Sequence, residues 1–281
     1  MNVRRLRRRV MSGLMTSLVG VLCGIAVLAL VLIFGDLVAK GATSLDWSFF
    51  TKNPVPAGEE GGGVANAIVG TGIIVGLAAL IGLPVGIGTG IYLAEYGSGR
   101  LGWIVRFVAD VLNGTPSIVI GIFAWTWLVK PMGRFSALAG GAALAALMIP
   151  MIARTTEEMV RLVPHSLREA ALALGYPHWR TSLRIVARTA LTGIVTGCLV
   201  AVARVAGETA PLLFTALGNL NFSTSVTQPM QTLSLQVYVY ATGPFDEWHR
   251  LAWAAALVLM GLVLSLSLLA RWATRQRYGA R

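Results

Sequence analysis

Charged side chains are scarce in this sequence of 281 residues. Asp, Glu, Lys and Arg together make up 12% of the chain, whereas 56% of its residues are hydrophobic and the mean hydropathy is +0.71. Soluble globular domains carry about 25% charged residues. The shortage of charge therefore excludes an ordinary water-soluble domain and indicates a polytopic membrane protein.

Cysteine and histidine are also rare. The two cysteines, Cys23 and Cys198, both lie inside apolar stretches, which argues against a disulfide framework. His165, His178 and His249 lie far apart and lack the spacing of paired metal ligands. We therefore expect no metal site and interpret both cysteines as small core residues.

Acidic residues are few, with 12 Asp and Glu against 23 Lys and Arg and a formal net charge of +11. Nucleic-acid binding is one interpretation of such an excess. Here, however, the basic residues cluster beside apolar runs of spanning length, where membrane topology explains them. We expect Glu95, Asp110, Glu157 and Glu158 to be interfacial or solvated carboxylates. No pair of them has the context of a glycosidase or metal site.

A nucleotide-binding loop is missing from the glycine-rich part of the chain. Gly82, Gly86 and Gly90, with Gly88 between them, are not followed by the Gly-Lys-Ser/Thr ending that such a loop requires. Small residues repeated every four positions allow two membrane helices to approach closely. We therefore expect helix packing at this ladder and no ATP hydrolysis by the chain itself.

Long apolar runs dominate what is present. A spanning helix needs about 20 mostly apolar residues, and six runs meet this requirement: 14–34, about 65–92, 103–129, 135–153, about 189–217 and 251–272. The expected fold class is therefore all-α, a polytopic membrane protein with six transmembrane helices. The expected divisions are a basic N-terminus (1–13), a first transmembrane helix (14–34), an external loop (35–64), a membrane core (65–272) and a basic tail (273–281).

The distribution of Lys and Arg predicts the orientation, because short loops rich in these residues stay in the cytoplasm. An even number of spans puts both termini on one side, and that side carries 17 basic residues against five on the other. Both termini are therefore predicted to be cytoplasmic. The first apolar run has about 21 residues and exceeds the 7–15 residues of a signal-peptide core, so we expect a retained anchor rather than a cleaved signal.

Two polar segments are predicted on the external side. Residues 36–64 contain Pro54, Pro56 and three successive glycines from Gly61, a composition that disfavours regular structure. The second segment, residues 218–250, begins with Asn, Ser and Thr and continues with the pattern of an amphipathic interfacial helix ending at Trp248. We expect the first segment to be an irregular loop.

A polar segment between the fourth and fifth spans carries the strongest functional signal. Within residues 154–188, short stretches of helical apolar periodicity are interrupted by Gly175 and Pro177. Glycine permits positive φ just past a helix end, and proline cannot continue the preceding helix. The segment is therefore predicted to form a helix-turn-helix. A hairpin this short must bury its apolar face, either on the chain's own cytoplasmic surface or in a groove of a partner.

Charged residues flank the turn of this predicted hairpin. Glu169 precedes it, and Arg180, Arg184 and Arg188 follow it. Such residues form charge-assisted contacts that set the angle at which two proteins dock. This favours docking into a partner over packing on the chain itself.

The spacing of residues in the hairpin resembles that of a known family. Glu169-Ala170-Ala171, three further residues, Gly175, nine further residues and Ile185 are similar to the EAA loop of the permease subunits of bacterial ABC importers. In that loop, Glu169, Ala170, Ala171 and Gly175 are the positions through which a separate ATPase is coupled to transport, and we assign Arg180 to the same surface.

The match has one local departure and several further supports. Ala187 and Arg188 stand where the EAA pattern has Leu and Pro. Stretches outside the hairpin are similar to the phosphate permeases of the PstA family, at residues 62–71, 82–96, 113–121 and 207–215. The resemblance extends over about residues 60–245.

The resemblance implies a transporter subunit of the bacterial cell (inner) membrane and not an enzyme. It implies a PstB-like ATPase, which would hold the ATP and magnesium, since no cofactor is expected on this chain. It also implies a PstC-like sister permease and an extracytoplasmic PstS-like phosphate-binding protein. Permeases for another oxyanion, such as sulfate or molybdate, and an ion-coupled secondary transporter are the alternatives, together with a non-transporting scaffold or sensor.

Arg204 is the one basic residue that the count of basic residues assigns to neither side, because it lies inside the fifth predicted span. An arginine at membrane depth costs at least about 2.5–3.5 kcal/mol, so it should face protein or water and have a partner. Glu208, four residues later, is the nearest candidate, and the two side chains on one helical face could simply neutralise each other. Alternatively, Arg204 donates hydrogen bonds to a phosphate in transit while Glu208 orients the guanidinium or accepts a proton.

Two predicted helix breaks favour the second interpretation. Pro211 would interrupt the fifth span just after Glu208, and freed backbone groups are tolerated where they line a cavity or meet protein. A break at Asn113–Ser117 adds hydroxyls and a helix start that suits an anion, although an ordinary proline kink explains it equally well. The predicted substrate-pathway residues are Arg204, Glu208, Thr209, Thr115 and Ser117.

Overall fold

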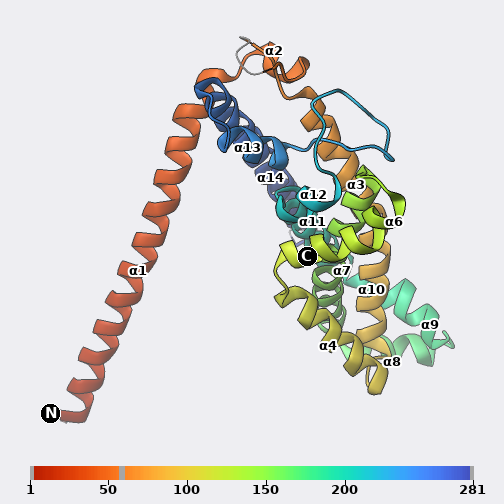
Figure 1. Cartoon of the computed structure of the whole chain (residues 1–281). Helices are drawn as coiled ribbons and strands as arrows, with labels where there is room; N and C mark the ends of the chain where they lie inside the picture. Colours follow the sequence, from red (N-terminus) through yellow and green to blue (C-terminus); the bar gives the residue numbers. More distant parts are fainter. Residues whose placement is uncertain (1–2, 57–60, 279–281) are drawn as a thin grey trace.

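The structure, a computed structural model, describes residues 3–56 and 61–278 (Figure 1). Within these ranges the regular elements are helices, apart from one isolated β-bridge between Leu217 and Met230. The long or central helices are α1 (Val3–Gly41), α3 (Ala65–Glu95), α4 (Arg100–Gly114), α5 (Ser117–Ala124), α7 (Ala137–Arg161), α11 (Leu191–Ala206) and α14 (Asp246–Tyr278). The shorter ones are α2 (Trp47–Thr51), α6 (Lys130–Met132), α8 (His165–Ala173), α9 (His178–Arg180), α10 (Ala187–Thr189), α12 (Ala210–Thr215) and α13 (Leu233–Ala241). The predicted all-α membrane fold is confirmed.

The described residues contain four unbroken helices that are long and apolar enough to cross a membrane, namely α1, α3, α7 and α14. Two further pairs pass this test only together: residues 100–132, with a bend of 105°, and residues 178–206, with a bend of 70°. If each bent pair is one span, the number reaches six. The first bend follows from the sequence, because Pro116 disfavours a helical conformation at Thr115, which is extended here.

The contact between α3 and α7 forms the centre of the fold. A Cβ atom on each ladder glycine would crowd a Cβ atom on α7, at 3.2 Å for Gly82 and Met148, 2.7 Å for Gly86 and Ile152, and 2.5 Å for Gly90 and Thr156. The position of a Cβ on Gly88 has nothing within 4 Å among the described residues. The prediction that the ladder serves close helix packing is therefore confirmed.

Replacing Gly90 by valine is expected to destabilise the protein, because the new side chain would enter the space of Thr156 and of the Ala153 carbonyl. Overpacking of this kind costs about 1–3 kcal/mol. The measurement is the midpoint of thermal unfolding in detergent. Gly88→Val is the matched control, since it adds the same β-branched residue to the same helix at an open position. Equal destabilisation by the two substitutions would contradict the packing explanation.

Helix α1 stands apart from the other helices and joins them near its C-terminal end (Figure 1). Its most apolar 18-residue window is 0% buried within the chain. The helix continues to Gly41, and α2 follows, so the prediction of a wholly irregular segment at 36–64 is wrong. An exposed ion pair of 2.8 Å between Asp36 and Lys40 lies in the additional turns of α1. The Asp46 carboxylate caps α2 by accepting a hydrogen bond from the Phe49 N–H.

The predicted interfacial helix before Trp248 is also corrected. The helix in this region, α13, ends at Ala241, and Trp248 belongs to α14. Leu233, Gln236 and Tyr240 of α13 are at most 1% exposed, and the helix packs against α14 and α3. A nine-residue apolar helix has the same pattern whether it lies at an interface or inside a fold, so the sequence could not distinguish the two.

Candidate functional site

A cavity of about 210 Å³ lies where the two interrupted helices meet. It is lined by Leu112, Asn113, Thr115, Pro116, Ser117, Leu147, Met151, Arg204, Val205 and Glu208. Four of the five residues predicted for the substrate pathway, Thr115, Ser117, Arg204 and Glu208, are therefore brought together from positions about 90 residues apart. Thr209, the fifth, is the N-cap of α12 and is not among the lining residues. We call this space the Arg204 cavity.

The two breaks build the Arg204 cavity. The first separates α4 from α5 at Thr115 and Pro116, and the second separates α11 from α12 at residues 207–209. Beyond the breaks the helices α5 and α12 are in close contact, since a Cβ on Gly121 would lie 2.7 Å from the Cα of Pro211. Glycine is required at this close approach of two backbones. The cavity is therefore lined by residues at the two breaks and by Leu147 and Met151 of α7.

Of the two interpretations of Arg204 and Glu208, the one in which they neutralise each other on one helical face does not hold, because α11 ends at Ala206, between the two residues. The Glu208 carbonyl accepts a hydrogen bond of 2.9 Å from the Ser234 hydroxyl, which fixes the backbone beyond the helix end. Within the described part of the chain, the exposed Arg204 guanidinium has no hydrogen bond or ion pair. An unpaired guanidinium in a cavity offers several donors to an oxyanion.

The predicted helix-turn-helix is present as α8, a turn and a second arm from His178 to Thr189. Gly175 has φ +82°, and the N–H groups of Tyr176 and Gly175 donate to the carbonyls of Ala171 and Leu172. This is the Schellman arrangement, in which a glycine in the left-handed region ends a helix. We call residues 165–189 the hairpin.

Large apolar side chains at the tip of the hairpin are exposed. Leu174 is 79% exposed, Trp179 is 54% exposed, and Tyr176 is also exposed, whereas Ala171 is buried. Arg180 lies over the ring of Trp179, with 5.1 Å between the guanidinium carbon and the ring centroid. Exposed apolar side chains gathered at one tip mark a surface that fits a protein partner.

Glu95, at the end of α3, fastens the hairpin to the membrane helices. One carboxylate oxygen accepts hydrogen bonds from Arg168 of the first arm, at 2.8 and 3.0 Å, and the other accepts one from Ser182 of the second arm, at 2.9 Å. Arg168 also donates to the Val160 carbonyl, at 2.9 Å, near the end of α7. The Glu95 and Arg168 side chains are 10% and 15% exposed. Both arms are therefore held by one largely buried carboxylate.

Glu157 of α7 is the centre of a second ion-pair cluster. Its Oε1 accepts from Arg106 of α4 at 2.7 Å and lies 2.6 Å from Arg161, while its Oε2 lies 3.8 Å from Arg154. The Glu157 side chain is 2% exposed. The expectation that this carboxylate is interfacial or solvated is wrong, because three arginines compensate for the loss of water.

Arg106 connects this second cluster to the first. Besides Glu157, it donates to the carbonyls of Leu93 and Gly97, at 2.7 and 2.8 Å, at the end of α3. It thereby satisfies carbonyl groups that the end of a helix leaves without partners. Since α4 continues from Arg106 to the break at Thr115, the hairpin is linked through α3 and α4 to the wall of the Arg204 cavity.

The remaining residues predicted for ATPase coupling lie on the outer surface of the hairpin. Glu169 faces a polar cavity of about 720 Å³, which is also lined by Glu95, Arg106 and Arg168. In the described residues, the Glu169 carboxylate has no ion pair. Glu169 and the exposed Ala170 are therefore available to another protein.

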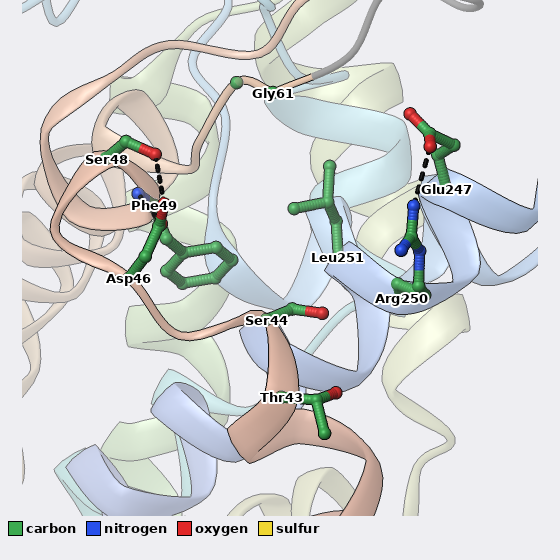
Figure 2. Close-up of a pocket in the computed structure, with 10 residues that line it drawn as sticks. Thr43, Ser44, Asp46, Ser48, Phe49, Gly61, Glu247, Arg250 and Leu251 are labelled. Carbon is green, nitrogen blue, oxygen red and sulfur yellow. Dashed lines mark hydrogen bonds and ion pairs between the residues drawn. The ribbon is translucent and has the colours of Figure 1, made fainter.

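A third polar cavity, of about 410 Å³, lies between the start of α14 and the segment that joins α1 to α2 (Figure 2). Ser48 donates to Asp46 at 2.6 Å, and this hydrogen bond, with that from the Phe49 N–H, holds the pKa of Asp46 below its ordinary value. Glu247 and Arg250 form an ion pair of 2.6 Å on the facing helix (Figure 2). Asp46 and the Glu247–Arg250 pair are each satisfied by neighbours in the same segment, which favours a structural role for these groups.

Residues 86–277 match the protein family described as "Binding-protein-dependent transport system inner membrane component". The chain is 48% identical over 245 residues to the phosphate transport system permease protein PstA of Yersinia pestis, with 86% of this chain and 82% of that protein covered. It is 44% identical to the protein of the same name from Haemophilus influenzae, with 95% and 94% covered. The phosphate transport system permease protein PstA 1 of Mycobacterium tuberculosis strain H37Rv is 38% identical, with 97% and 91% covered.

Solved structures with a similar fold belong to more distant proteins. A chain of a bacterial ABC transporter involved in the import of the acidic polysaccharide alginate matches with a TM-score of 0.68 at 14% identity, covering 97% of this chain and 99% of that one. A chain of the MetNI methionine ABC transporter matches with a TM-score of 0.61 at 17% identity, covering 78% and 96%. At these identities the likeness supports the fold alone.

Proposed function

Because the chain belongs to the family of binding-protein-dependent transport system inner membrane components, and is thus a membrane permease subunit and not itself an enzyme, we propose that it carries inorganic phosphate inward through the membrane. Energy comes from ATP hydrolysis in a separate subunit. The names of its relatives support phosphate as the substrate. The chemistry of the Arg204 cavity supports an oxyanion.

Arg204 is the binding group of this proposal. Arg204, Ser117, Thr115 and Glu208 line the same cavity. A guanidinium donates two parallel hydrogen bonds to a phosphate, and the Ser117 hydroxyl can donate a further one, whereas the Thr115 hydroxyl donates to the Val111 carbonyl. Glu208 accepts a hydrogen bond from a protonated phosphate oxygen, which a fully deprotonated oxyanion such as sulfate cannot donate. This difference supports phosphate over sulfate or molybdate.

The hairpin transmits the work of the ATPase. Its exposed apolar tip docks into the partner, and Glu169 and Arg180 set the docking angle. Displacement of the hairpin moves α3 through Glu95, and α3 moves α4 through Arg106. The break between α4 and α5, which lines the cavity, then changes shape. The observation that carries the proposal is this connected route from the exposed hairpin to the cavity, made of the Arg168–Glu95 ion pair, the hydrogen bonds of Arg106 to the end of α3, and helix α4 itself.

The partners are those that the family resemblance implies. A PstB-like ATPase binds the hairpin, a PstC-like sister permease completes the pathway, and a PstS-like protein delivers phosphate from outside. Both termini and the hairpin lie in the cytoplasm, in agreement with the excess of 17 over five basic residues on that side.

The test is reconstitution of the chain with these three partners in liposomes. We expect phosphate-loaded binding protein to stimulate ATP hydrolysis, and labelled phosphate to accumulate only when ATP is present. Accumulation by the purified chain alone, driven by an ion gradient without ATP, would support the secondary-transporter alternative. Equal competition by sulfate or molybdate would contradict phosphate specificity.

Glu169→Lys and Gly175→Val are expected to uncouple transport without loss of folding. The first reverses a charge on the docking surface, and the second puts a β-branched residue at φ +82°, which distorts the turn. Uptake should fall about tenfold for each 1.4 kcal/mol of docking free energy lost. The measurements are phosphate uptake and phosphate-stimulated ATP hydrolysis in the same liposomes.

Gly175→Asn is the matched control for the turn, since asparagine tolerates the left-handed region. It should retain most of the uptake. Wild-type uptake in Glu169→Lys and Gly175→Val together would contradict the coupling role of the hairpin.

A further inference from the structure

A groove separate from the Arg204 cavity lies at the bend between the second arm of the hairpin and α11. Its volume is about 710 Å³, and it shares no lining residue with the Arg204 cavity. One wall consists of Leu83, Ile87 and Ile91 of α3, and the other of α11 side chains that include Leu191 and Val195. The walls are apolar, so the groove suits a hydrocarbon chain.

Two arginines line this groove beside its apolar walls. Arg184 and Arg188 line it, both are exposed, and neither makes a hydrogen bond or ion pair in the described ranges. They lie four residues apart in one continuous helical arm, where like charges repel each other. An anion bound between them would remove this repulsion.

The bend between the arm and α11 indicates the depth of these arginines in the membrane. The arm that carries them turns by 70° into α11, which begins at Leu191 with the apolar run of the fifth predicted span. A polar arm that bends into a span lies at the boundary between headgroups and hydrocarbon. Arg184 and Arg188 are then level with lipid phosphates, and the apolar walls are level with acyl chains.

We propose that this groove binds one anionic phospholipid of the cytoplasmic leaflet. Its headgroup phosphate lies between Arg184 and Arg188, and an acyl chain follows the walls formed by α3 and α11. Basic pockets between membrane helices on the cytoplasmic side bind anionic headgroups in this way. Inorganic phosphate would satisfy the arginines but leave the apolar walls uncovered, and an apolar protein helix would cover the walls but leave the two charges unpaired.

The lipid would support the second arm of the hairpin from the membrane side. Leu183, beside Arg184, is 55% exposed and lines the groove, so a bound acyl chain would cover it. The proposal depends on the membrane location of the chain and not on the transported substrate. A lipid-binding experiment therefore succeeds or fails independently of phosphate transport.

The test is native mass spectrometry of the full-length chain, purified with any subunits that accompany it and incubated with phosphatidylglycerol or phosphatidylcholine. We expect one phosphatidylglycerol to be retained in preference to phosphatidylcholine. Arg184→Gln/Arg188→Gln should reduce this retention by about tenfold or more, since the charge-assisted hydrogen bonds to the headgroup phosphate are lost. Inorganic phosphate at the same concentration should not displace the lipid; displacement would indicate a simple anion site and overturn the proposal.

Arg7→Gln/Arg8→Gln is the matched control. It removes the same charge from the same predicted face of the membrane, at exposed residues of α1 that are far from the groove in sequence. Equal loss of lipid in the two double variants would indicate general attraction to a basic surface and overturn the proposal. Equal retention of both lipids by the wild type would also overturn it.

A photo-crosslinking residue in place of Val195 tests the occupant of the groove directly. Val195 is 38% exposed and lines the groove. We expect cross-links to phospholipid in membranes, and their reduction by Arg184→Gln/Arg188→Gln. Cross-links to a second membrane subunit in place of lipid would show that a protein covers the groove and would overturn the proposal.

Discussion

Arg204→Gln is expected to reduce phosphate uptake by about 100-fold or more, since two charge-assisted hydrogen bonds of about 1.5–3 kcal/mol each are lost. The subunit should still fold and assemble. The reason is that Arg204 has no hydrogen-bond or ion-pair partner within the described residues, so its removal leaves no buried carboxylate uncompensated. The measurements are labelled-phosphate uptake in liposomes and the thermal unfolding midpoint of the same preparation.

Arg204→Lys is the informative control for this prediction. Lysine keeps the positive charge but cannot form two parallel hydrogen bonds with one phosphate. An intermediate loss of uptake is therefore expected. If both substitutions unfold the protein, Arg204 is a structural residue, and if both leave uptake unchanged, the cavity is not the phosphate pathway.

Glu157→Ala is expected to have the largest effect on stability. Glu157 is buried and lies within ion-pair distance of Arg106, Arg161 and Arg154. Removing one member of a buried ion pair costs about 3–5 kcal/mol, because the other charge remains without compensation. Arg106 is 23% exposed and is partly screened by water. The loss of stability expected from leaving Arg106 without Glu157 is therefore at the lower end of this range. The measurement is the unfolding midpoint and the amount of protein recovered from membranes.

The neighbouring residue supplies the control. Glu158 is 59% exposed and pairs with Arg154 at 3.3 Å. Exposed ion pairs contribute about 0–1 kcal/mol, so Glu158→Ala should change stability little. Similar losses in Glu157→Ala and Glu158→Ala would contradict the assignment of Glu157 as the centre of a buried cluster.

Much of the architecture was predictable because it depends on local patterns. Runs of about 20 apolar residues indicated the candidate spans, the Gly82–Gly90 ladder indicated close packing, and Gly175 with Pro177 indicated the turn of the hairpin. Each signal lies within a few helical turns of sequence. The two breaks were also predictable, since Pro116 and Pro211 restrict the backbone directly.

The ion-pair clusters were not predictable, because their members are distant in sequence. Arg106 and Glu157 are 51 residues apart, and Glu95 and Arg168 are 73 residues apart. A single sequence shows the charges but not which of them meet. The spacing of Glu157 and Arg161 by one helical turn was a visible signal, although it did not indicate burial. The sequence also left open whether Arg204 and Glu208 pair, since the pairing alternative assumed a helix that in the structure ends at Ala206.

The glycine ladder between α3 and α7 has a consequence for how the protein changes shape. Two helices that pack glycine against side chain at three successive turns move as one rigid body, since sliding would force Met148, Ile152 and Thr156 of α7 into the backbone of α3. A change in the shape of the Arg204 cavity must then take place at hinges outside this rigid pair. The helix breaks before Ser117 and before Ala210 are suited to be those hinges. Substitutions at the hinges should change the rate of transport per protein molecule. Substitutions between α3 and α7 should instead change the amount of folded protein in the membrane.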